Sequence, residues 1–197
     1  MAGQNPAIVD NTFVSPRACG PCSFCCYVAE LPQLEKKAYA WCRHNAPGGG
    51  CSIHSTRPDI CRNFQCMWTY AALLDDRWRP DNCHFMMRSG PAEELVIDVD
   101  PGFPEAWKQE PFYGQIRAWS TRTAPPIRPV LVRSGGHVYV VFPEGEVGLG
   151  PEQFNTPVQS GYVSRGGRIQ PYAHYGTDPD PPPSFGSQAS PLASRPR

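Results

Sequence analysis

The sequence predicts an α+β fold: a small, cysteine-rich and mostly helical metal-binding module, then a β-rich lobe with a hairpin, and a disordered C-terminal tail. Eight of the nine cysteines lie between residues 19 and 66, whereas short apolar runs typical of strands dominate after residue 84. The chain has 197 residues, 40% of them hydrophobic, which permits a real core. We place the cysteine module at residues 15–90, an α/β lobe packed on it at 91–177, and a tail rich in proline and serine at 178–197.

The cysteine module opens with closely spaced thiols, Cys19-Gly-Pro-Cys22-Ser-Phe-Cys25-Cys26. Two C-x-x-C steps in register let a tight loop aim several thiolates at one point, as zinc knuckles and iron–sulfur loops do. Neighbouring side chains diverge, so we expect Cys26 to face a second ion, a second iron of a cluster or the core. Two four-sulfur sites that share the loop, or one cluster with accessory thiols, both remain open. The candidate metal ligands are Cys19, Cys22, Cys25, Cys26, Cys42, Cys51, Cys61 and Cys66.

A framework of disulfides is the alternative to metal. The first ten residues have neither the basic start nor the apolar run of a signal peptide, which favours a cytoplasmic location. In a reducing cytosol, clustered cysteines are more often metal ligands or redox groups than cross-links. Nine thiols also leave one unpaired in any fully intramolecular disulfide scheme. We therefore favour metal.

A second cysteine block strengthens this interpretation. It reads Cys51-Ser-Ile-His54-Ser-Thr-Arg57-Pro58-Asp59-Ile60-Cys61-Arg62-Asn63-Phe64-Gln65-Cys66. Together with the first run it resembles the bacterial cysteine-cluster proteins of the CxxCxxCC or YkgJ-like family, which are described as zinc- or iron-chelating domains. The resemblance covers roughly residues 17–90 and implies bound zinc or an iron–sulfur cluster, without deciding between them. His54 departs from the family, which more often has tyrosine there, and is either an extra ligand or a polar substitute.

The remaining residues of the second block suit a metal site. A divalent ion with four thiolates carries a net charge of about −2, so nearby cations stabilise it. Arg57 and Arg62 are the candidates for this cofactor-binding role, with surface ion pairs or helix capping as the alternative. Because the two blocks must converge on the metal, we expect Cys22, Cys25, Cys61 and Cys66 to be among the ligands. Cys83 lies outside both blocks, and we expect no metal there.

Local patterns predict the secondary structure. We expect a helix over residues 31–42 with Leu34, Ala38 and Trp41 on one face, a short helical turn over 58–64 that presents Cys61, and a packing helix over 64–74. Further on we expect strands at 84–88 and 94–99, and a helix over 104–119 that is interrupted or begins again at Pro111. We also expect a hairpin of 129–133 with 137–142 around Ser134-Gly135-Gly136. The tail has too few apolar residues to fold.

Charge and motif content narrow the function classes. With 18 basic and 18 acidic residues there is no electrostatic pull towards nucleic acid, and no apolar run is long enough for a membrane span. Residues 91–177 hold no cysteine and no arrangement to which catalysis can be assigned, so we name no catalytic residue and lean against an enzyme. The expected partners are a metal ion or cluster and a protein. The favoured function is a non-catalytic metal-binding protein; the alternative is an iron–sulfur enzyme or redox component.

Overall fold

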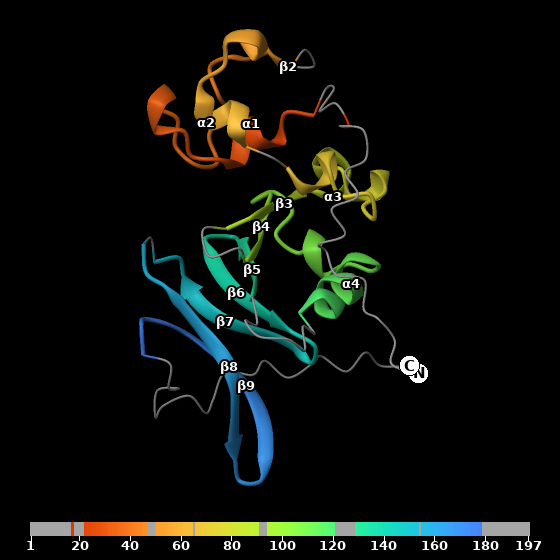
Figure 1. Ribbon diagram of the computed structural model, residues 1–197, viewed down its shortest axis with the longest axis vertical. Helices are drawn as coiled ribbons and strands as arrows, with labels where there is room; N and C mark the ends of the chain where they lie inside the picture. Colours follow the sequence, from red (N-terminus) through yellow and green to blue (C-terminus); the bar gives the residue numbers. More distant parts are fainter. Residues whose placement is uncertain are drawn as a thin grey trace.

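The computed structural model describes residues 17, 22–46, 50–64, 66–90, 94–120, 129–153 and 155–178. It has mixed helix and strand content with a β-rich second half, which confirms the α+β class at this level. Figure 1 shows the cysteine-rich segment at one end of an elongated molecule, a sheet in the middle and a long hairpin at the other end. The predicted disordered tail from residue 179 onwards lies outside the described residues.

A five-stranded sheet forms the centre of the molecule. Its strands are β3 (Phe85–Ser89), β4 (Leu95–Val99), β5 (Val130–Ser134), β6 (His137–Phe142) and β7 (Gly145–Pro151), in the order β3-β4-β5-β6-β7. Neighbouring strands are antiparallel except β4 and β5, which are parallel. The two predicted strands and the predicted hairpin are confirmed. The hairpin turn consists of Gly135 and Gly136 with φ of 59° and 77°, a pair of positive values that glycine adopts without a steric penalty.

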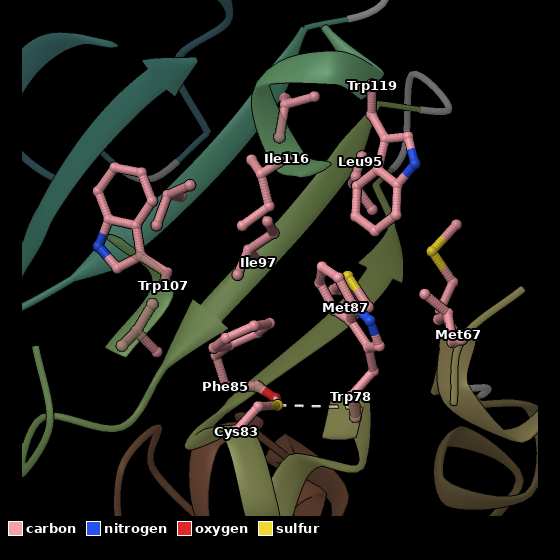
Figure 2. Close-up of a cluster of buried hydrophobic side chains, with 14 of the residues drawn as sticks. Met67, Trp78, Cys83, Phe85, Met87, Leu95, Ile97, Trp107, Ile116 and Trp119 are labelled. Carbon is pink, nitrogen blue, oxygen red and sulfur yellow. Dashed lines mark hydrogen bonds between the residues drawn. The ribbon is translucent and has the colours of Figure 1, made fainter. Parts of the chain in front are cut away.

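The crossover between β4 and β5 covers one face of the sheet. It contains the 3₁₀ helix η5 (Ala106–Lys108) and the helix α4 (Phe112–Trp119). The predicted helix over 104–119 is thus divided into two before Phe112, at Pro111. The main core lies between this crossover and the sheet (Figure 2). Its members include Phe85, Met87, Ile97, Val99, Val132, Trp107, Ile116 and Trp119. The residues of α4 that face the sheet recur at helical spacing, which gives the short helix one buried side.

The opposite face of the sheet is covered at its two ends by different segments. At β3, Met86 packs against Phe24 and Val28 of the helix α1 (Phe24–Val28). Over β5, β6 and β7, a cluster that includes Leu131 and Val140 packs with Ala173 from the hairpin of β8 (Val158–Arg165) and β9 (Arg168–Tyr175). Covering on both faces explains why every residue of β4 is buried.

The cysteine-rich segment is built from short elements. After α1 these are η1 (Pro32–Leu34), β1 (Asn45–Ala46), β2 (Gly50–Cys51), η2 (His54–Thr56), α2 (Asp59–Asn63), η3 (Met67–Thr69), η4 (Asp76–Trp78) and α3 (Pro80–Cys83). The helix α2 confirms the predicted turn that presents Cys61. The predicted module boundary at residue 90 falls between β3 and β4, which pair with each other.

Two predicted helices are wrong. Over residues 31–42 the structure has only η1, because Glu35 turns to a left-handed φ of 52° and Lys36 pairs back with Leu31. Trp41, expected on the buried face, is 62% exposed. Over residues 64–74 only η3 forms. The apolar residues there nevertheless pack as expected, since Met67, Trp68, Ala71 and Leu74 are all buried in the main core.

Candidate metal centre

The described cysteines come from several separate segments. Cys25 and Cys26 lie on α1, Cys42 in the loop before β1, Cys51 on β2 and Cys61 on α2. The backbone N–H of Cys42 donates to the carbonyl of Cys26 over 3.0 Å, which ties the loop to α1. Cys19 lies outside the described residues.

Four thiols form what we call the Cys61 group: Cys26, Cys42, Cys51 and Cys61. Burial raises the pKa of the Cys61 thiol, and negative charge on Cys26, Cys42 and Cys51 raises it further. Such charge effects mean that the other three thiols lie within electrostatic range of Cys61. The fold therefore brings together side chains from α1, the loop before β1, β2 and α2.

Lys36 supplies a buried positive charge to this group. The residue is 5% exposed, and its Nζ donates to the carbonyl oxygens of Tyr27 (2.9 Å), Lys37 (3.0 Å) and Ala29. Burial lowers the pKa of Lys36, while thiolate charges on Cys42 and Cys26, among others, oppose that shift. A buried ammonium is costly unless it is paired and hydrogen-bonded, and Lys36 has both carbonyl and thiolate neighbours.

Cys26 is the thiol whose ionisation is favoured. A side-chain hydrogen bond with Cys25 and, secondarily, the charge of Lys36 lower the pKa of the Cys26 thiol to about 7, although burial acts in the opposite direction. Thiolate rather than thiol is the form that binds metal. The Cys26 thiol therefore ionises near neutral pH, which gives the form that can bind metal.

The two arginines of the second block differ in their contacts. Nη1 of Arg57 lies 2.9 Å from Nε2 of His54 and donates to the His54 carbonyl over 2.7 Å, while its charge lowers the pKa of Cys61. Arg62 donates to the Arg57 carbonyl over 3.0 Å and forms an exposed ion pair of 3.6 Å with Asp59. Arg57 thus acts on a candidate ligand, whereas Arg62 supports the backbone at Arg57. The His54 imidazole is placed against Arg57.

The other described cysteines lie closer to the core. Cys22, Cys25 and Cys66 pack against the cluster of Phe24, Val28 and Met86. Cys83 is 2% exposed, and its thiol donates to the carbonyl oxygens of Phe85 (3.1 Å) and Trp78 (3.6 Å). Burial raises the pKa of Cys83 to about 12, and negative charge on Cys66 and Cys22 adds to the increase. Cys83 is therefore an un-ionised core thiol near Cys22 and Cys66.

The cysteine donors suit a metal, but the positions of the described cysteines do not form a binding site in this structure. Cysteine sulfur is the donor that structural zinc and iron–sulfur clusters take, so the chemistry of the Cys61 group fits either. Within the described part of the chain, no three His, Cys, Asp or Glu side chains are positioned to hold one ion. Cysteine side chains would have to turn towards a common point to bind one.

Comparisons with family models, with curated proteins and with solved structures find no match to this chain. The resemblance to the CxxCxxCC family therefore remains a prediction from the residues between Cys19 and Cys66. Among the helices of the described residues, none has the length and apolar character to cross a membrane.

Sequence reasoning missed Lys36 and a set of charged side chains on the sheet. Lys36 looked like one of several mixed charges on a helix surface, and no sequence pattern marks it as buried. Asp98 and Arg133, by contrast, interrupt apolar strands at positions whose neighbours are all buried. A charge at an inward position of a strand is a signal that could have been used.

Replacing Lys36 with methionine is expected to lower the free energy of unfolding by about 1–3 kcal/mol, because buried carbonyl groups lose their donor. Urea denaturation of the protein as purified measures this. The matched control is Lys37→Met next to it, where the side chain is exposed and a change within about 0.5 kcal/mol is expected. Equal losses in the two variants would contradict the assigned contacts of Lys36.

Proposed function

We propose that this chain is a non-catalytic metal-binding protein whose cysteine cluster holds zinc or an iron–sulfur cluster. One observation carries the proposal. Four separate segments place the thiols of the Cys61 group within electrostatic range of Cys61, and the buried Lys36 lies close to several of them. A bound metal would cross-link α1, the loop before β1, β2 and α2, which are individually too short to be stable.

Charge supports the same proposal. Four thiolates around a divalent ion, or around an oxidised four-iron cluster, leave a net charge of about −2. Lys36 and Arg57 are the cations next to the Cys61 group, and positive charge close to metal-bound sulfur stabilises it. Arg57 would act on the ligand Cys61, and Arg62 would hold the backbone of Arg57 in place.

The number of sites follows from the grouping of the thiols. The Cys61 group would hold one metal, and Cys22, Cys25 and Cys66 are the described candidates for a second site, to which the C-x-x-C spacing of the sequence adds Cys19. Cys25 and Cys26 would then serve different sites, which would be adjacent, because the two side chains are hydrogen-bonded to each other. We propose a reducing, cytoplasmic setting for this thiol-rich segment, and membership of the CxxCxxCC family.

Anaerobic purification with metal analysis tests the proposal. Zinc in a colourless protein would assign a zinc site, whereas a brown protein bleached by dithionite would assign an iron–sulfur cluster. A brown protein would also be consistent with the alternative function, an iron–sulfur enzyme or redox component. A protein that contains neither metal, and whose unfolding does not change when Zn²⁺ is added under reducing conditions, would contradict the proposal.

A further inference from the structure

A cleft of about 760 Å³ lies between the cysteine-rich segment and the sheet, on the sheet face that carries Met86 and Leu131. The side formed by the cysteine-rich segment includes the apolar residues Val28, Ile60 and Phe64, together with the polar Asn63 and the exposed Glu30. The other side is formed by charged residues of the sheet. The cleft is of the size that small-molecule sites have.

Four charged side chains line this second side: Arg88 on β3, Asp98 on β4, Arg133 on β5 and Glu152 just after β7. Arg88 Nε lies 2.7 Å from Asp98 Oδ2, Arg133 Nη1 lies 3.8 Å from Asp98 Oδ1, and Arg133 Nε lies 3.0 Å from Glu152 Oε1. We call these residues the charged quartet. Asp98 and Arg133 are register partners near the carboxyl ends of the two parallel strands, the edge at which open sheets bind ligands.

The arginines of the charged quartet are more exposed than its carboxylates. The side chains of Arg133 and Arg88 are 35% and 22% exposed, whereas those of Glu152 and Asp98 are 17% and 10% exposed. The carboxylates therefore lie deeper and hold the guanidinium groups, while the guanidinium groups are the more accessible partners. Partly buried ion pairs stabilise a fold little compared with apolar residues, so the charged quartet is a candidate for a role beyond stability.

Tyr39 adds a further polar group at the cleft. Its backbone has a left-handed φ of 56°, and the residue lines the cleft from the cysteine-rich segment. Burial, with the charges of Asp98 and Glu152, raises the pKa of Tyr39 to about 12. The phenol therefore stays protonated at neutral pH and can donate a hydrogen bond.

We propose that the cleft binds a small organic anion, with its carboxylate or phosphate head on Arg133 and Arg88 and its apolar body against Val28, Ile60 and Phe64. Arginine suits this role because its planar fork of donors matches the oxygens of either head group. This site is separate from the proposed metal-binding function, since none of the four charged residues is a candidate ligand.

The test uses three probes on the full-length protein: phenylacetate, phenyl phosphate and the neutral 2-phenylethanol. Amide chemical shifts are followed by NMR at millimolar concentrations. We expect at least one anion to shift amides around the cleft, such as those of Gly136 and Glu152, and the alcohol to bind far more weakly. The stronger of the two anions identifies the head group. No shift with either anion, or equal binding of the alcohol, would overturn the proposal.

Variants separate a binding site from a purely structural ion network. Arg133→Met should weaken anion binding by roughly tenfold or more, as expected for loss of a charged hydrogen-bonding partner, and Arg133→Lys should weaken it less. The control is Arg77→Met, which alters an exposed arginine paired with Asp75 at 2.6 Å and should leave binding unchanged. Ala38→Trp should block the cleft without touching the charged quartet, so it decides the matter if Arg133→Met fails to fold. Unchanged affinity in Arg133→Met would show that the charged quartet only joins the strands, and unchanged affinity in Ala38→Trp would show that the anion binds outside the cleft. Either result would overturn the proposal.

Discussion

Cys61→Ser is expected to lose at least one equivalent of bound metal and to lower the melting temperature of the metal-loaded protein sharply. Negative charge on Cys26, Cys42 and Cys51 raises the pKa of the Cys61 thiol, so Cys61 lies within electrostatic range of all three. Its replacement removes one of the four candidate metal ligands of that group. Structural zinc sites couple binding to folding, with apparent binding free energies of about 10–16 kcal/mol in small zinc domains. Metal content by mass spectrometry and thermal unfolding by circular dichroism measure the two effects.

Cys83→Ser is the matched control for Cys61→Ser. Cys83 is a buried thiol that donates to backbone carbonyls in the main core, and we expect no metal there. Serine at this position places a more polar group in an apolar site, so some stability is lost while the metal is retained. Metal content rather than stability is therefore the deciding measurement. Loss of metal in Cys83→Ser as large as in Cys61→Ser would mean that the metal site extends to the core cysteines.

A second comparison distinguishes one metal site from two. If Cys22, Cys25 and Cys66 serve a separate site, Cys66→Ser should remove a different equivalent of metal from the one lost in Cys61→Ser, and the double variant should lose both. If a single cluster uses both sets of thiols, either change should remove the same metal and the double variant should lose no more. Additivity of this kind is expected only for independent sites.

The β-rich part of the fold was predictable because its signals are local. Apolar runs at 84–88 and 94–99 and the Gly-Gly turn between the two strands of the hairpin need no knowledge of distant residues, and all three are confirmed. The hairpin of β8 and β9 was not predicted, although it has the same signal in Gly166-Gly167, both with positive φ. Its alternation is less clear because polar residues occur on both sides of β8.

The cysteine-rich segment was less predictable because tertiary contacts decide its backbone. The pattern of residues 31–42 favours a helix, yet the helical turn ends after Leu34. The ammonium of Lys36 instead donates hydrogen bonds to three carbonyl oxygens. Helix propensity amounts to tenths of a kcal/mol per residue and is easily outweighed by such contacts. Cysteine spacing identified the candidate ligands, but which thiols lie together depends on loops that spacing does not describe.

Phe85→Ala is expected to lower the free energy of unfolding by about 3–5 kcal/mol, a large share of the stability of a typical domain. Phe85 is fully buried at the start of β3 (Figure 2), and its ring makes edge contacts with Trp78 (centroids 6.0 Å apart) and Phe112 (5.2 Å). Removing the ring leaves a cavity between the sheet, η4 and α4, which rigid aromatic neighbours fill poorly. Urea denaturation followed by tryptophan fluorescence measures the change.

The control for Phe85→Ala is Phe103→Ala in the crossover. Phe103 is 50% exposed and stacks on His84, with ring centroids 3.7 Å apart, so its removal creates no enclosed cavity and should cost less than about 1 kcal/mol. The difference between the two stability losses tests whether β3 belongs to the main core or to the cysteine-rich segment. If β3 belonged to an independent cysteine module, Phe85→Ala would disturb that module and leave the unfolding of the sheet unchanged. A single unfolding transition, lowered throughout, is the result that the pairing of β3 with β4 predicts.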